Sequence, residues 1–221
     1  MEKNNSIFIT GTDTDIGKTF VSAGLCLALK NKGLKVGYFK PFQSGAILKE
    51  GKLIAPDVEE LKKYNIKTLY SYLFKGDVSP HLASVLNNIE ININKIKNDL
   101  DNFKNENDFV VIEGAGGLYC PAIKGKLFAD IISELNQEII IVTTPDLGRI
   151  NHTLMTIDCA KNKGIKIRGL IINKMPENKT LSQENFIKEL KMFTDIKILG
   201  VIPKMETCSE SAIYQAFKDI I

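Results

Sequence analysis

The chain has 221 residues, of which 44% are hydrophobic and 25% are charged, and these values are ordinary for a soluble globular protein. Its formal net charge of +3 is too small, and its lysines are too scattered, to indicate a nucleic-acid partner. No apolar run is long enough to span a membrane and residues 1–5 lack the apolar core of a signal peptide, so we expect a cytoplasmic protein that does not bind membranes.

The most informative stretch lies near the N-terminus. Residues 7–9 are apolar and β-prone, and an apolar pattern at helical spacing begins at Thr19, after a polar loop. A strand, a loop, Gly17-Lys18-Thr19 and a helix form the arrangement of a phosphate-binding loop. In such a loop backbone N–H groups point at a polyphosphate, Lys18 can reach the β- and γ-phosphates, and the Thr19 hydroxyl can bind Mg²⁺. The stretch predicts nucleotide binding, with an ordinary β–α turn as the alternative; its first glycine, Gly11, stands one position earlier than usual.

The next predicted strand, residues 36–39, is followed by Lys40 and Pro41. Because proline breaks strand pairing, we expect Lys40 at the carboxyl end of this strand, the edge where parallel sheets bind ligands; a solvated lysine is the alternative. Residues 46–56 are predicted to form a loop. Asp57 precedes a short helical pattern and is interpreted as its N-cap, or else as an acidic residue that faces the nucleotide.

The middle of the chain contains one more apolar strand. Residues 66–78 are predicted to be irregular, residues 79–80 (Ser-Pro) are typical of a helix start, and residues 92–104 form an amphipathic helical pattern. The strand at residues 109–112 is predicted to end in Glu113 and a glycine-rich turn. A carboxylate there suits a second loop that faces phosphate and Mg²⁺; a solvated glutamate on a flexible turn is the alternative.

Strands and helices continue to alternate toward the C-terminus. Asn151, a good cap residue, is expected to start one helix, and Asn173 follows a strand, where it can bind a base edge or form a turn. The predicted strands are 139–142, 167–172 and 198–202, and the predicted helices are 128–135, 151–163, 181–193 and a tail from 209.

Nearly every predicted strand is apolar on both faces, which indicates a parallel sheet covered by helices on both sides. We therefore predict an α/β fold with a doubly wound, mostly parallel sheet, in a single domain over residues 1–221. Polar side chains follow five of the strands and are expected to meet at one edge: Lys18, Lys40, Glu113, Asp146 and Asn173.

The cysteines indicate neither disulfides nor a metal cluster. Cys26, Cys120, Cys159 and Cys208 are far apart in sequence and form no Cys-x-x-Cys pair, so we expect reduced thiols. With only two histidines, a histidine-rich metal site is excluded.

Several separate blocks, in the same order, resemble the dethiobiotin synthetase family, which has a P-loop NTPase-like fold. The resemblance extends from residue 7 to about residue 204, and Asp15 stands where the family more often has Glu. The matching blocks are residues 11–19, Lys40-Pro41-x-x-Ser44-Gly45, Ser79-Pro80-His81, residues 113–117 and Leu147-Gly148-x-Ile150-Asn151-His152.

This resemblance implies an ATP- and Mg²⁺-dependent ligase of biotin biosynthesis. CO₂ adds to one amine of 7,8-diaminopelargonic acid (7,8-diaminononanoate), and the resulting carbamate attacks the γ-phosphate of ATP to give a carbamic-phosphoric anhydride. The second amine then closes the ring, and dethiobiotin, ADP and phosphate result.

The resemblance also implies the roles of individual residues. Lys18 and Lys40 are expected to stabilise the γ-phosphate and the carbamate, and Thr14 and Asp15 to lie beside the substrate amines as further catalytic residues. The expected Mg²⁺ ligands are Thr19, Asp57 and Glu113. The expected nucleotide contacts are Asp13, Thr14, Asp15, Ile16, Gly17, Lys18, Thr19, Phe20, Glu113, Gly116, Asn173 and Pro203. The expected substrate contacts are Thr14, Lys40, Ser44, Gly148, Ile150 and Asn151, of which the last three are predicted to bind the substrate carboxylate across a homodimer interface.

Two other classes share this kind of loop. Partitioning and septum-site ATPases usually carry an additional lysine near the position of Thr12, and their membrane-targeting tails are basic; residues 209–221 carry little positive charge. Amidotransferase-type synthetases that amidate corrin rings need a glutaminase domain, for which we expect no room in 221 residues.

Overall fold

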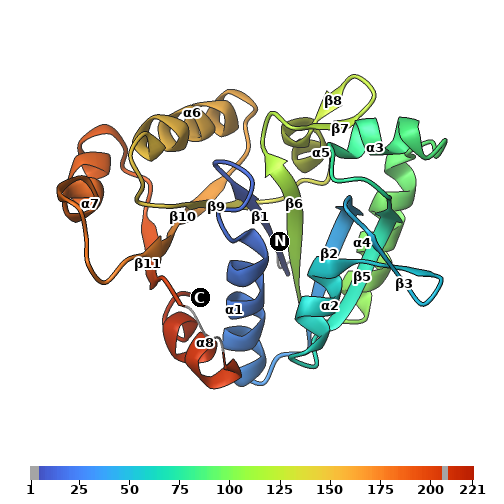
Figure 1. Cartoon of the computed structure of the whole chain (residues 1–221), viewed down its shortest axis with the longest axis horizontal. Helices are drawn as coiled ribbons and strands as arrows, with labels where there is room; N and C mark the ends of the chain where they lie inside the picture. Colours follow the sequence, from blue (N-terminus) through green and yellow to red (C-terminus); the bar gives the residue numbers. More distant parts are fainter. Residues whose placement is uncertain (1–4, 206–208) are drawn as a thin grey trace.

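A seven-stranded sheet forms the centre of the computed structural model, which describes residues 5–205 and 209–221 (Figure 1). Its strand order is β11-β10-β9-β1-β6-β2-β5, and every neighbouring pair is parallel. This confirms the predicted α/β sheet. The bounds are β1 Ser6–Gly11, β2 Val36–Gln43, β5 Lys67–Leu73, β6 Phe109–Gly117, β9 Ile139–Thr143, β10 Ile167–Met175 and β11 Ile198–Pro203.

Helices cover both faces of the sheet because side chains alternate between the faces along each strand. In β1, Ile7 and Ile9 pack into one core and Phe8 into the other. The first core contains α1 Lys18–Asn31, α2 Pro56–Lys62 and α8 Glu210–Phe217. The second contains α4 Ile93–Asn105, α5 Phe128–Glu134, α6 Arg149–Asn162 and α7 Leu181–Phe193.

The loop after β1 lies at a switch in the strand order. β1 pairs with β6 on one side and with β9 on the other, so the chain leaves β1 at the middle of the sheet. In Figure 1 this loop stands at the upper edge, where the arrow of β6 also points. Ligands of open α/β sheets bind at this position, outside the carboxyl ends of the strands.

Two strands are longer than predicted. β2 continues through Pro41 to Gln43. The proline is tolerated there because the pairing of β2 with β6 ends at Phe39, and the pairing with β5 includes Lys40 and Phe42 but not Pro41. β6 continues through the glycine run to Gly117, so the predicted turn at Glu113 was wrong. A Cβ on Gly117 would lie 3.1 Å from the Gly11 carbonyl oxygen, and glycine therefore allows β6 to approach the start of the loop closely.

Two segments predicted to lack regular structure contain strands. Residues 66–78 include the edge strand β5, whose sequence TLYSYL over residues 68–73 is in fact β-prone. Residues 46–56 form a hairpin of β3 Ile47–Lys49 and β4 Lys52–Ile54. Its two turn residues, Glu50 and Gly51, both have positive φ, as a tight hairpin turn requires. A second small antiparallel pair, β7 Pro121–Ile123 and β8 Lys126–Leu127, was not predicted.

The starts of two helices also differ from the prediction. Ala55 is the N-cap of α2, so Asp57 lies in the first turn rather than at the cap. Gly148, with φ 85°, is the N-cap of α6, which puts Asn151 inside the helix. The start of α3 Pro80–Leu86 is as predicted, since the Ser79 side chain accepts a hydrogen bond from the Leu82 N–H.

Across the described residues, none of the helices has the length and apolar character that crossing a membrane would take. Cys26, Cys120 and Cys159 are free thiols, as predicted. Cys208 lies outside the described residues, as do residues 1–4 of the N-terminal segment.

Candidate active site

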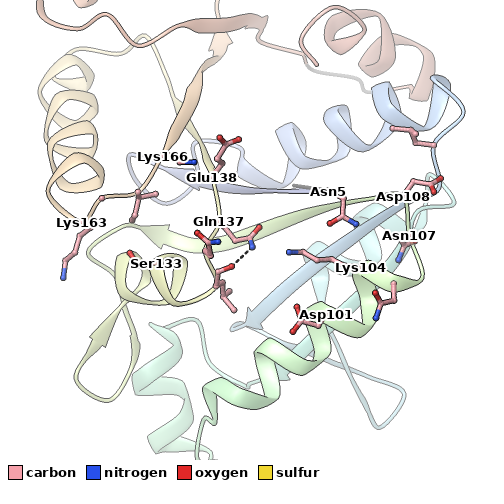
Figure 2. A pocket seen from close by; sticks show the side chains of 16 residues that line it. Asn5, Asp101, Lys104, Asn107, Asp108, Ser133, Gln137, Glu138, Lys163 and Lys166 are labelled. Carbon is pink, nitrogen blue, oxygen red and sulfur yellow. Dashed lines mark hydrogen bonds between the residues drawn. The ribbon is translucent and has the colours of Figure 1, made fainter. Parts of the chain in front are cut away.

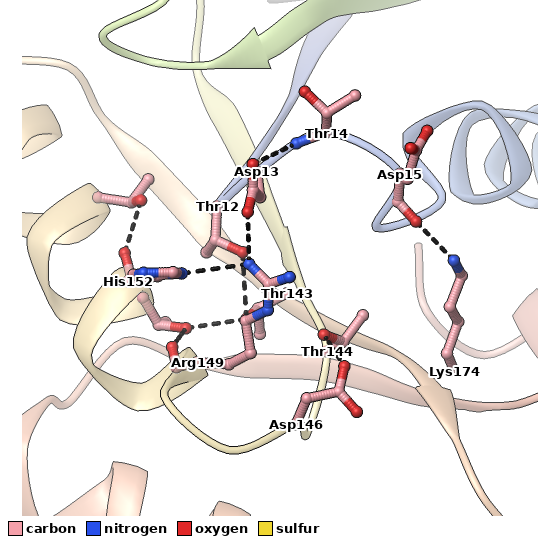
Figure 3. Close-up of polar contacts among 12 residues, drawn as sticks. Thr12, Asp13, Thr14, Asp15, Thr143, Thr144, Asp146, Arg149, His152 and Lys174 are labelled. Carbon is pink, nitrogen blue, oxygen red and sulfur yellow. Dashed lines mark hydrogen bonds and ion pairs between the residues drawn. The ribbon is translucent and has the colours of Figure 1, made fainter.

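The loop between β1 and α1 is held in shape by the end of β10. Gly17 has φ 89°, and a Cβ there would lie 2.2 Å from Asn173 Nδ2, so only glycine fits. The Asn173 amide donates a hydrogen bond of 2.8 Å to the Ile16 carbonyl oxygen. Lys174 donates from its ammonium to the Asp15 carbonyl oxygen at 2.5 Å (Figure 3). Sequence reasoning identified Asn173 but missed Lys174, its neighbour.

Lys18 begins α1 and is buried at the loop. Its ammonium donates a hydrogen bond of 2.8 Å to the Asp13 carbonyl oxygen. Burial lowers the pKa of this lysine below its ordinary value, although nearby Glu113 opposes the shift. Lys18 is therefore a desolvated cation beside the N–H groups of a helix start, which is an arrangement suited to binding phosphate.

Lys40 lies between two carboxylates under the loop. Its Nζ is 2.7 Å from Glu113 Oε1 and 2.5 Å from Asp57 Oδ2, and the residue is only 3% exposed. Burial lowers the pKa of Lys40, but the attraction of Glu113 and Asp57 outweighs it and the net shift is upward. Burial raises the pKa of Asp57, but Lys40 outweighs it and the net shift is downward. The three groups form a buried ion triad, which excludes the alternative of a solvated lysine.

Glu113 makes further contacts besides its pairing with Lys40. It accepts hydrogen bonds from the Thr19 hydroxyl at 2.9 Å and from the Tyr38 hydroxyl at 2.8 Å. Burial raises the pKa of Tyr38 well above its ordinary value, so the phenol stays protonated and donates. Sequence reasoning missed Tyr38, although its place in a buried strand before Lys40 was a usable signal. Glu113 is only 1% exposed, which excludes the solvated-glutamate alternative.

The oxygen atoms around Lys40 suit a hard cation. Thr19, Asp57 and Glu113 come from three elements and contribute a hydroxyl and two carboxylates near one ammonium. Among the described residues no group of three His, Cys, Asp or Glu side chains converges as a complete metal cage. Mg²⁺ commonly binds one or two carboxylates and takes its other ligands from phosphates and water, so this donor set fits Mg²⁺.

The residues expected on the substrate side differ in their surroundings. Thr14 and Asp15 are exposed, and the Thr14 N–H donates to Asp13 Oδ1 at 2.8 Å. The Ser44 hydroxyl oxygen is buried and has no hydrogen-bond partner within the described part of the chain, as expected of a group that a bound molecule would satisfy. Asn151 is exposed in the first turn of α6. Gly148 and Ile150 flank Arg149, which bonds to Asp13 across the loop (Figure 3).

Some predicted site residues make other contacts. Asp146 accepts a hydrogen bond from the Thr144 hydroxyl at 2.7 Å and makes no ion pair among the described residues. The Phe20 ring packs edge-on against Phe217 of α8. Gly116 has φ 64° and packs against Cys120, and Pro203 is an exposed residue at the end of β11.

A hollow of about 1450 Å³ lies at the opposite edge of the sheet (Figure 2). Asn5, Glu138 and Lys166, which precede β1, β9 and β10, contribute to its lining. The lining mixes lysines, carboxylates and amides and contains no residue of the phosphate-binding loop. We therefore assign the chemistry to the carboxyl edge, where the loop and the triad lie.

Known proteins resemble this chain in sequence and fold. The family model described as an AAA domain matches residues 5–212. The ATP-dependent dethiobiotin synthetase BioD of Clostridium novyi (strain NT) is 38% identical, and the match covers 98% of this chain and 95% of that protein. The protein of the same name from Methanococcus vannielii is 39% identical over 89% of this chain and 92% of its own length.

Solved structures with the same fold are more distant in sequence. The septum site-determining protein MinD of Pyrococcus horikoshii OT3, complexed with Mg-ADP, superimposes with a TM-score of 0.64 at 20% identity, covering 98% of this chain and 93% of that chain. A ParA family ATPase from Chlorobium tepidum TLS gives a TM-score of 0.60 at 14% identity, covering 98% and 91%. At such identities the likeness concerns the fold alone, and it confirms the predicted P-loop NTPase-like class.

Proposed function

The chain belongs to the dethiobiotin synthetase family and is an ATP-dependent ligase of biotin synthesis, and we propose that it converts 7,8-diaminopelargonic acid and CO₂ to dethiobiotin. In the proposed reaction CO₂ and one amine form a carbamate, whose oxygen attacks the γ-phosphate of ATP and releases ADP. The second amine attacks the carbonyl carbon of the resulting carbamic-phosphoric anhydride. Phosphate leaves as the cyclic urea forms.

The observation that carries this proposal is the buried ammonium of Lys40, which pairs with Asp57 and with Glu113, whose carboxylate also accepts a hydrogen bond from Thr19 at the phosphate-binding loop. The carbamate and the γ-phosphate are both anionic, so their reaction needs charge neutralisation and positioning more than covalent catalysis. We assign that role to Lys40 and Lys18. Lys18 is bonded to a neutral carbonyl, which a phosphate oxygen can replace in a stronger, charge-assisted bond.

The remaining proposed contacts follow from the chemistry of each group. Thr14 and Asp15 lie on the exposed part of the loop, where they can bind the substrate amines, and Ser44 is assigned to the carbamate or the substrate. The Asn173 side-chain N–H donates to the Ile16 carbonyl oxygen of the loop, and its Oδ1 has no hydrogen-bond partner among the described residues. That oxygen can accept a hydrogen bond from the adenine amino group. Backbone N–H groups of residues 13–20 are assigned to the phosphates.

We propose that Thr19, Asp57 and Glu113 hold Mg²⁺. The bound ion would supply charge neutralisation for the phosphates of ATP. The Lys40 ammonium makes ion pairs with both Asp57 and Glu113. The same lysine therefore offsets part of the cost of placing two carboxylates side by side, one buried and one partly exposed.

We also propose a homodimer in which the start of α6 binds the substrate carboxylate of the partner's site. Gly148 and Asn151 are exposed there, and the free N–H groups of a helix start favour a carboxylate. Sedimentation analysis at assay concentrations tests this assembly. A fully active monomer would contradict it.

Product analysis tests the proposed reaction. The protein is incubated with Mg-ATP, the diamine and ¹³C-bicarbonate, and the products are identified by mass spectrometry. We expect one labelled carbon in a cyclic urea and one ADP for each product molecule. ATP hydrolysis without a labelled product, or hydrolysis that depends on DNA or on lipid vesicles, would favour a partitioning or septum-site ATPase instead.

A further inference from the structure

Arg149 makes a contact that the motifs of the sequence do not explain. It is the first residue of α6 and occupies the position that the matching block Leu147-Gly148-x-Ile150-Asn151-His152 leaves open. Its Nη1 donates to Asp13 Oδ2 at 2.8 Å and lies 3.1 Å from His152 Nδ1 (Figure 3). The Arg149 side chain is 22% exposed, so it is partly protected from solvent. A guanidinium with two neighbouring acceptors is fixed in direction.

Asp13, which Arg149 binds, is joined to two residues of the proposed site. Its Oδ1 accepts a hydrogen bond from the Thr14 N–H, and its backbone oxygen accepts one from the Lys18 ammonium. The hydrogen bond from Arg149 lowers the pKa of the Asp13 carboxyl, with a smaller contribution from the Thr14 N–H. A displacement of Asp13 would therefore reach both the phosphate lysine and the backbone beside the proposed amine site.

A second, buried route joins the same two segments. The Thr12 hydroxyl lies 3.4 Å from the Thr143 hydroxyl at the end of β9, which lies 2.9 Å from the Thr153 hydroxyl. Thr153 in turn donates to the Arg149 carbonyl oxygen at 2.6 Å. Thr143 and Thr153 are completely buried. The backbone of Arg149 is thereby anchored, so its side chain reaches the loop from a fixed base.

We propose that Arg149 is a positioning residue that sets the affinity for ATP by holding the phosphate-binding loop through Asp13. Two effects act in the same direction. The guanidinium neutralises a carboxylate beside the expected polyphosphate, and it restricts a loop that would otherwise lose conformational freedom when ATP binds. The inference rests on the proposed function in one respect, which is that the proposed function assigns the polyphosphate to this loop. Arg149 also connects the loop to the helix start that is proposed to bind the substrate carboxylate.

Calorimetric titration with Mg²⁺ and a non-hydrolysable ATP analogue tests the inference without requiring turnover. The ion pair between Arg149 and Asp13 is partly exposed, and such pairs contribute up to about 1 kcal/mol. We therefore expect Arg149→Ala to weaken binding of the analogue about fivefold. The KM for ATP should rise about as much, with kcat within about twofold of wild type. Arg149→Lys should recover part of the affinity because it keeps the charge but has only an ammonium to donate. Arg149→Gln serves as a second variant if alanine impairs folding.

The matched control is Lys163→Ala. Lys163, at the other end of α6, makes an ion pair of 2.7 Å with Asp130, away from the loop. Its removal should leave the affinity for the analogue within about twofold of wild type. Equal affinities for Arg149→Ala or Arg149→Gln and Lys163→Ala would overturn the inference.

A double-variant cycle tests whether Arg149 acts through Asp13. If it does, Asp13→Ala, which removes both carboxylate oxygens, combined with Arg149→Ala should bind the analogue no more than about twofold more weakly than Asp13→Ala alone. Losses that multiply would show that Arg149 acts by another route and would refute the inference. A wild-type protein that binds the analogue but forms no cyclic urea would refute the proposed function, while the cycle would still decide the role of Arg149.

Discussion

Replacing Lys40 by methionine should destabilise the fold through the carboxylates that it leaves behind. Methionine keeps most of the length of the side chain but removes the ammonium that lies 2.7 Å from Glu113 and 2.5 Å from Asp57. Removing one partner of a buried ion pair costs roughly 3–5 kcal/mol. Glu113 keeps its two hydroxyl donors and the Asp57 side chain is 28% exposed, so we take the lower end, about 3 kcal/mol at pH 7.

The difference between the two proteins should depend on pH in a defined direction. The pKa of Asp57 is lowered in the folded protein, so its pairing with Lys40 stabilises the fold above the ordinary value of 3.8. That stabilisation is lost as the pH falls through the lowered folded pKa. The pKa of Lys40 is raised, so its contribution is fully present below 10.5 and disappears only as the pH rises through the folded value. The destabilisation by Lys40→Met should therefore be steady from about pH 5 to 9 and shrink below about pH 4.

Urea unfolding followed by circular dichroism measures this effect, with Lys62→Met as the matched control. Lys62 makes a pair of 2.7 Å with Glu59, but both side chains are about half exposed, so its loss should cost less than about 0.5 kcal/mol. A Lys40→Met protein within about 1 kcal/mol of wild type at pH 7, with an unchanged m-value, would refute the buried triad.

Two further variants test the support of the site. Tyr38→Phe removes one of the hydroxyl donors to buried Glu113 and should lower the free energy of unfolding by about 1 kcal/mol. In a thermal melt this is a decrease in the melting temperature of roughly 3 °C. An unchanged melting temperature would contradict the 2.8 Å hydrogen bond. Gly17→Ala places a Cβ 2.2 Å from Asn173 Nδ2 at a residue with φ 89°. Calorimetry should therefore find that an ATP analogue binds at least about tenfold more weakly. An affinity within about twofold of wild type would show that the loop tolerates the side chain.

Much of the fold could be predicted because its strongest signals are local. Hydrophobic period and length predicted β1, β9 and α7, the last with the bounds Leu181–Phe193 as observed. The errors arose where tertiary context overrides a local rule. Pro41 is tolerated because β2 has lost one neighbour, and the glycines after Glu113 extend a strand beside the loop instead of forming a turn.

The candidate site was predictable only in part, for a related reason. A shared sheet edge and a family resemblance selected Lys18, Lys40, Glu113 and Asn173, and the structure brings Lys40 and Glu113 into direct contact. Tyr38 and Arg149 were missed, although the place of Tyr38 in a buried strand before Lys40 was a usable signal of burial near the site. Their roles depend on which strand neighbours which and on how α6 begins, and sequence spacing alone does not specify either.

The most direct test of the central claim is to measure phosphate release from Mg-ATP by wild type and by Lys40→Met, with and without the diamine and bicarbonate. The measurement is made under conditions where circular dichroism shows that both proteins are folded. We predict release that requires both co-substrates and that falls by at least about a hundredfold in the variant, since one group stabilising transition-state charge contributes on this order. Release that is indifferent to the diamine, or that persists in the folded variant, would contradict the proposed reaction or the assignment of Lys40 to it.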